Sequence, residues 1–178
     1  AGGPRGLISI KGVKYTTGLE VGERAGRLVA AGLGVPLIGK TPVLYGGAAW
    51  LSPSDVVEAA ARHGYGLTVE AARRLADHYG SEVEHVLAAG RFDRGALLTG
   101  TTDVLRAEVR HAVRREHAQT LADVVLRRTD LGTLACPREE TLAAAAQEMS
   151  GVLGWDADRQ AREVASVRAV YPVFSASA

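Results

Sequence analysis

The chain has 178 residues, of which 47% are hydrophobic and 23% are charged, and its formal net charge is +1. This length and balance predict a globular protein with a real core and about one domain, and the near-neutral charge gives no electrostatic reason to expect a nucleic-acid partner. The single cysteine, Cys136, excludes an internal disulfide and favours a reducing, cytoplasmic setting, and no apolar stretch is long enough to cross a bilayer.

The chain begins with a pattern typical of a strand that runs through a tight turn into a helix. Residues 7–10 are an apolar run that predicts a buried strand, and Gly12 predicts the turn. Thr16 and Thr17 then open a helix that runs to residue 33. The unpaired N–H groups and the dipole of a helix start favour an anionic ligand, and Lys14 would present positive charge to it. From spacing alone, an ordinary strand–helix packing unit is the favoured alternative.

The rest of the chain predicts a linker and then a helical bundle. Residues 34–51 are rich in glycine and proline, which breaks any periodicity. Helices with recognisable caps and short loops follow, including a capping-box pattern that begins at Ser81. The predicted helices cover residues 52–64, 68–80, 81–90, 103–116, 120–128, 139–153 and 156–170.

The predicted fold class is therefore mainly α. A strand–turn–helix unit at residues 1–33 forms the edge of an α/β domain, residues 34–51 are a linker, and residues 52–178 form a compact all-α helical domain. Because no strand and no initiator methionine precede the first unit, we expect the remainder of that domain to lie in sequence outside this chain.

Two motifs match binding patterns but lack the context that the chemistry needs. Residues 34–41 fit the phosphate-loop pattern G-x-x-x-x-G-K-[ST], yet a helix precedes them and Pro42 follows at once, so we do not expect a nucleotide site. His78, Glu82 and His85 have the spacing of metal ligands. A glycine–serine break separates the first from the other two, so exposed polar residues are the favoured interpretation and no metal is expected.

Two further features have a structural interpretation beside the functional one. The row Arg106, Arg110 and Arg114 suits phosphate or an acidic lipid surface, but a solvated helix face is more common. Trp155 is expected to anchor the core at a helix junction. On these observations, a non-catalytic helical module for subunit or membrane-surface contact stays open as an alternative function.

Several blocks of the chain resemble one family in the family's own order. Residues 7–17 are similar to the motif GGK-x-TT-[YF]-R, and residues 107–129 to the signature AEVRYAVRxE…TLxDVLxRRT. Shorter similarities are Leu-Tyr-Gly-Gly at 44–47, Tyr-Gly-Ser at 79–81 and the M…LGW ending at 149–155. These blocks resemble the FAD-dependent glycerol-3-phosphate dehydrogenases.

The resemblance implies a C-terminal third of such an enzyme. The family oxidises glycerol 3-phosphate to dihydroxyacetone phosphate, passes a hydride to FAD and passes the electrons on to quinone, or to oxygen in its oxidase branch. By position, the implied cofactor-binding residues lie against the flavin pyrimidine, and the missing part of the FAD domain is needed to hold the cofactor. These residues are Gly12, Val13, Lys14, Tyr15 and Thr16.

The resemblance also implies partners, and two departures qualify it. Implied partners are the remainder of the FAD domain, a phosphorylated polyol or other hydroxy substrate and a quinone, with a homodimer and peripheral contact at the inner face of the membrane left open. Val13 replaces the family's second glycine, and Gly18-Leu19 replaces an aromatic residue and an arginine. The missing arginine leaves another hydroxy compound open as the substrate. No catalytic residue is assigned in this chain, which is expected to be inactive by itself.

Overall fold

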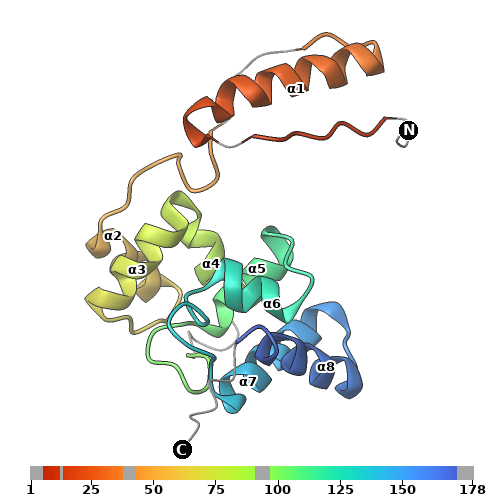
Figure 1. Cartoon of the computed structure of the whole chain (residues 1–178). Helices are drawn as coiled ribbons and strands as arrows, with labels where there is room; N and C mark the ends of the chain where they lie inside the picture. Colours follow the sequence, from red (N-terminus) through yellow and green to blue (C-terminus); the bar gives the residue numbers. More distant parts are fainter. Residues whose placement is uncertain (1–5, 13, 38–42, 91–96, 172–178) are drawn as a thin grey trace, which may run out of the picture. The chain divides into compact units, whose positions relative to one another are not determined.

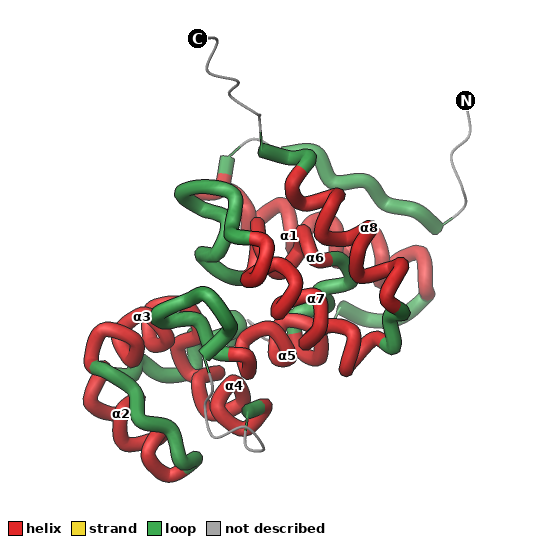
Figure 2. The backbone as a smooth tube through the Cα atoms, turned by 90° about the horizontal axis from the view of Figure 1, so that it is seen from below, coloured by secondary structure: helices red, strands yellow, loops and turns green. Residues whose placement is uncertain are grey.

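The computed structural model describes residues 6–12, 14–37, 43–90 and 97–171. The chain divides into two units, residues 1–42 and 43–178, and the division falls inside the segment 34–51 (Figure 1). Over the described residues the protein is mainly α-helical, as predicted, and its only β pairing there is an isolated bridge between Leu97 and Leu105 (Figure 2). No helix of this part of the chain is both long enough and apolar enough to cross a membrane.

The first unit consists of one long helix and the segment that leads into it. Helix α1 spans Gly18–Leu33, directly after the 3-10 turn η1 at Tyr15–Thr17. It ends at Gly34, whose φ of 67° lets its N–H return to the carbonyls of the last turn.

The buried strand predicted at residues 7–10 is wrong for the structure of this chain. These residues have no regular secondary structure, and Leu7 and Ile10 are 68% and 58% exposed. A strand needs a neighbouring strand to accept and donate its backbone hydrogen bonds, and no described residue of this unit pairs with the segment.

The second unit begins with three helices that share one core. They are α2 at Pro53–Arg62, α3 at Val69–Tyr79 and α4 at Val83–Ala89. As predicted, Ser52 caps α2 and Thr68 caps α3 through their hydroxyl oxygens, which accept backbone N–H groups three residues on. The fully buried side chains between these helices include Val56, Leu75, Val83, Val86 and Leu87.

The capping box predicted at Ser81 is wrong. Residues Gly80–Glu82 form a 3-10 turn, η2, and α4 begins only at Val83. The Ser81 hydroxyl instead accepts the backbone N–H of Ala48 at 3.2 Å. A long-range contact with the segment 43–51 has therefore replaced the local cap.

The remaining helices form a second core. They are α5 at Arg106–Arg115, the short α6 at Leu121–Asp123, α7 at Glu139–Leu153 and α8 at Ala157–Arg168. Asp156 caps α8, as predicted, and Thr120 and Asp123 cap α6 reciprocally. Trp155 is partly buried and packs against this core, which confirms the prediction that it anchors the core at a helix junction.

Three boundaries in this group differ from the prediction. Helix α5 starts at Arg106 rather than at residue 103, because residues 97–105 close a turn in which the Leu98 N–H donates to the Val104 carbonyl at 2.8 Å. The helix predicted through residue 128 changes after Asp123 into a π-helical segment, η3, at Val124–Arg128. Helix α8 ends at Arg168 instead of near residue 170.

Helix α5 joins the two cores. Its first turn brings Ala107 into the core of α2, α3 and α4, whereas Val109, Ala112 and Val113 belong to the core of α6, α7 and α8. Figure 2 shows α5 between these two groups. Polar side chains on α5 therefore meet helices of both groups, so a polar site can form on either side of α5.

Candidate functional site

The predicted cofactor-binding segment leads directly into the start of α1. Gly12, Lys14 and Thr16 are exposed, while Val13 and the side chain of Tyr15 lie outside the described residues. The Thr17 backbone N–H and hydroxyl both donate to the Lys14 carbonyl, at 3.4 Å and 3.2 Å.

The start of α1 carries no side-chain cap. Thr17 occupies the N-cap position of α1 but makes no side-chain capping bond. The first N–H groups of the helix are thus left uncapped by a side chain, in an exposed segment beside Lys14. No described contact of residues 12–16 shows which of them would meet a cofactor, so cofactor binding by this segment stays a prediction.

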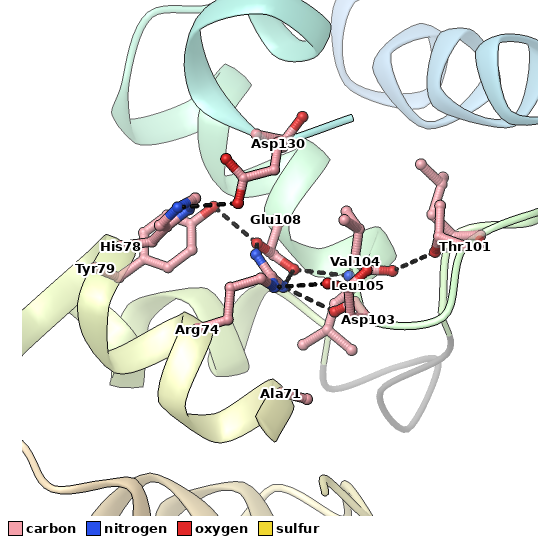
Figure 3. Close-up of polar contacts among 12 residues, drawn as sticks. Ala71, Arg74, His78, Tyr79, Thr101, Asp103, Val104, Leu105, Glu108 and Asp130 are labelled. Carbon is pink, nitrogen blue, oxygen red and sulfur yellow. Dashed lines mark hydrogen bonds and ion pairs between the residues drawn. The ribbon is translucent and has the colours of Figure 1, made fainter. Parts of the chain in front are cut away.

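The best-formed polar site of the second unit is a buried ion pair between α3 and α5. The Glu108 side chain is fully buried, and that of Arg74 is 13% exposed. Two guanidinium nitrogens of Arg74 donate to the two carboxylate oxygens of Glu108, at 2.8 Å and 2.5 Å (Figure 3). This is the planar two-pronged arrangement in which an arginine–carboxylate pair is strongest.

Further groups complete the hydrogen bonding of Glu108. The Leu105 backbone N–H donates to it at 2.7 Å, and the Tyr79 hydroxyl donates to it at 3.1 Å. Arg74 also donates to the Asp103 carbonyl at 2.7 Å, so the pair ties α3 to both the start of α5 and the turn before it. The Arg74 Nε atom is buried without a hydrogen-bond partner and lies 3.5 Å from Asp103 Oδ2, whereas the Glu108 carboxylate is fully engaged, so the pair serves to hold the elements together.

The electrostatics of the pair agree with this structural role. Burial alone would lower the pKa of Arg74, but its bonds to Glu108 and the charges of Glu108 and Asp103 raise it. Burial, followed by the charge of Glu108, raises the pKa of Tyr79 far above its ordinary value, so its hydroxyl stays a donor.

A junction of two glycines places Tyr45 against α5. Gly46 and Gly80 have φ values of +75° and +49°, and the Gly46 carbonyl accepts the N–H of Ser81 at 2.9 Å. A Cβ on Gly46 would lie 2.8 Å from the Tyr79 carbonyl oxygen, and a Cβ on Gly80 would overlap the Gly46 carbonyl oxygen. Only glycine permits this close approach of two backbones.

The junction directs the Tyr45 hydroxyl to His111, at 2.5 Å from its Nε2. His111 is 1% exposed, and burial lowers its pKa to about 4, so the ring is neutral at neutral pH. The Tyr79 ring contacts the imidazole edge-on, with ring centroids 5.5 Å apart. Burial and the charge of Glu116 raise the pKa of Tyr45 to about 12.

Two of the three arginines in the row on α5 are bound to another helix, whereas Arg114 is exposed. Arg106 Nε donates to Glu148 Oε1 at 2.6 Å, and Arg110 Nε donates to Glu148 Oε2 at 2.7 Å. Glu148 lies on α7 and is buried. The first two arginines of the row therefore clamp α5 to α7, and the prediction of a solvated face is wrong for them because this face meets another helix.

The remaining candidate motifs do not assemble into sites. His85 pairs with Glu82 at 2.8 Å, but His78 pairs with Asp130 at 3.1 Å, so the three residues do not converge on one point. Over the described residues, no group of three or more histidine, cysteine or acidic side chains is placed to hold a metal ion. Of the phosphate-loop pattern, residues 38–41 lie outside the described residues.

No local sequence pattern gives Arg74, Glu108 or Tyr45 a role. One signal was available for Glu108, because it lies three residues after Leu105 and next to Val109, on the inward face of α5. A carboxylate on the apolar face of a helix predicts a buried partner. Arg74 lies 34 residues away, and nothing local identifies it as that partner.

The comparisons with known proteins agree with this helical unit. The sequence model of one family, described as the C-terminal domain of alpha-glycerophosphate oxidase, matches residues 38–160, which is more than half of the chain. Among curated proteins, none matches the chain. The chain thus belongs to the family of C-terminal domains of alpha-glycerophosphate oxidase, a family of FAD-dependent oxidoreductases.

Proposed function

We propose that the chain is the C-terminal part of a flavoprotein that oxidises glycerol 3-phosphate to dihydroxyacetone phosphate and passes the electrons to a quinone. The observation that carries this proposal is the family match over residues 38–160. Leu19 stands where the resembling enzymes have an arginine, so a related hydroxy compound is the second candidate substrate.

Within that protein, residues 12–16 and the start of α1 hold the flavin edge. FAD supplies the hydride acceptor when it is bound. The uncapped N–H groups at the start of α1 and the ammonium of Lys14 stabilise the negative charge that reduction places on the N1–C2=O2 edge of the ring. The support for this role is the exposed segment leading into an uncapped helix start.

The test uses this chain in frame with whatever sequence precedes it in the gene. The longer polypeptide is expected to purify with FAD, whereas residues 1–178 alone bind negligible flavin. An exposed ion pair between the Lys14 ammonium and the reduced flavin edge would contribute about 0.5–1 kcal/mol, so Lys14→Met lowers the two-electron reduction potential by about 10–20 mV. Lys11→Met is the matched control, because Lys11 lies before the turn.

Two results would contradict the proposal. A longer polypeptide that stays colourless and cannot be reconstituted with FAD would exclude the flavoprotein assignment. Equal potentials for Lys14→Met and Lys11→Met would keep the assignment but remove the role of the segment. The first readout is absorbance and the second is a potential, so neither depends on knowing the substrate.

The alternative of a helical interaction module for subunit or membrane-surface contact is less favoured, although Arg114 of the arginine row stays exposed. Arg106 and Arg110, which suggested an acidic surface as partner, are bound to Glu148. A homodimer, and a cytoplasmic place at the inner face of the membrane, remain proposals within the flavoprotein function. Cosedimentation of the longer polypeptide with anionic vesicles would test that location.

A further inference from the structure

A cavity of about 440 Å³ opens in the second unit beside the Tyr45–His111 contact. Its walls come from four places in the chain: the segment 43–51, the end of α3, the end of α5 and the segment from η3 to residue 130. This volume is in the range of small-molecule sites. Neither the flavin segment nor the Arg74–Glu108 pair lines it.

One wall carries a buried carboxylate with an unused oxygen. The Glu116 side chain, just after α5, is 10% exposed, and its Oε2 atom has no hydrogen-bond partner. The nearest cation is loosely placed, with Arg128 Nε 4.0 Å from that oxygen. An unpaired buried carboxylate oxygen is costly, and a donor brought by a ligand would remove that cost.

Burial raises the pKa of Glu116, while Arg128, the Tyr45 hydroxyl and His78 act against this and Glu108 adds to it. These groups come from η3, from the segment 43–51, from α3 and from α5, so every wall of the cavity contributes to the charge balance at Glu116.

Two guanidinium groups on consecutive residues also line the cavity. Arg127 and Arg128 end the π-helical segment η3, and a π-helical turn often marks a functional site. Arg127 uses one nitrogen for Asp123, at 3.0 Å, and its side chain is 63% exposed. Both groups therefore retain N–H donors that suit a phosphate or carboxylate.

The charges around the cavity favour a ligand that carries both signs. Its lining includes the two arginines and three carboxylates, of which Asp130 is paired with His78. The lining therefore offers guanidinium donors to an anionic group and carboxylate acceptors to a cationic group. A metal ion is not indicated, because no suitable ligand group occurs among the described residues.

We propose that this cavity binds a small zwitterion whose ammonium group donates to Glu116 and whose anionic group is held by Arg127 and Arg128. The ammonium group satisfies the unused carboxylate oxygen and displaces Arg128 towards the anion. The site lies wholly within residues 43–178, so it does not depend on the flavin.

The test is calorimetric titration of the 178-residue chain with phosphoethanolamine, which carries one ammonium and one phosphate group. We expect a Kd of about 1 mM or tighter, and binding at least about tenfold weaker for ethanolamine or inorganic phosphate alone. Glu116→Gln keeps the shape of the side chain and is expected to weaken phosphoethanolamine binding by about tenfold or more. Glu70→Gln, on the exposed first turn of α3, is the matched control and leaves the Kd unchanged.

Three results would overturn the proposal. One is no measurable binding of phosphoethanolamine by a chain whose helical circular dichroism is intact. A second is equal affinity for inorganic phosphate, which would reveal an arginine site for anions alone. The third is an unchanged Kd in Glu116→Gln, with the amide and methyl NMR spectrum confirming that the variant is folded.

Discussion

Replacing Arg74 by methionine tests whether the buried ion pair holds α3 to α5. Methionine keeps an unbranched apolar side chain of similar length but removes both bonds to Glu108 and the bond to the Asp103 carbonyl. The carboxylate of Glu108 is fully buried, so no solvent replaces the guanidinium. Removing one partner of such a pair costs about 3–5 kcal/mol.

The loss should be measurable as a large fraction of the total stability. Small domains unfold with about 5–15 kcal/mol, so Arg74→Met should lower the urea midpoint by roughly a fifth or more with an unchanged slope. The measurement is urea unfolding followed by circular dichroism at the helical band. Arg73→Met is the matched control on the same helix, because Arg73 is exposed, and it should stay within about 0.5 kcal/mol of the parent.

A double variant separates charge burial from lost packing. In Arg74→Met with Glu108→Gln, the glutamine oxygen still accepts the Leu105 N–H, but no uncompensated charge is left in the interior. We expect the double variant to recover at least about 1 kcal/mol relative to Arg74→Met. A cost of less than about 1 kcal/mol for Arg74→Met, or a double variant less stable than Arg74→Met, would refute this reasoning.

Three further predictions concern pH and the local geometry. The pKa of His111 is about 4 when folded and 6.5 ordinarily. As the pH falls, the unfolded chain therefore binds the proton before the folded chain does, and the free energy of unfolding falls by about 3 kcal/mol from pH 6.5 to 4. His111→Gln should flatten this part of the stability–pH curve. An unchanged slope would contradict the assignment of this pH dependence to His111. Gly80→Ala forces a Cβ against the Gly46 carbonyl and should lower the free energy of unfolding, measured in urea, by about 2–4 kcal/mol. Its control is Gly151→Ala, in open space on α7, which should be neutral or stabilising by up to about 1 kcal/mol. Thr120→Ala removes the cap of α6 and should lower the thermal midpoint by the equivalent of about 1 kcal/mol; no change in the midpoint would show that the capping bond contributes nothing.

The family assignment and most of the helices could be predicted from the sequence. Ser52, Thr68 and Asp156 cap the helices at the predicted places, because each cap bonds to a backbone N–H only three residues away. Such interactions are complete within one helical turn, so the order of residues is enough to reveal them.

Local patterns failed where a distant segment competed for the same group. Ser81 has the spacing of a capping residue, but its hydroxyl is taken by Ala48 of the segment 43–51. The apolar run at 7–10 has the composition of a strand, but a strand also needs a partner, which composition does not supply.

The helical periodicity, most of the caps and the family follow from the order of residues, since they depend on positions close together in the chain or on a long ordered set of matches. Three pairings become visible only once the helices are packed: Glu108 binds Arg74, Glu148 binds two arginines of α5, and Glu116 lines a cavity. The physical reason is that a buried charge is defined by the helix packed against it, and which helices meet depends on the packing of the whole core.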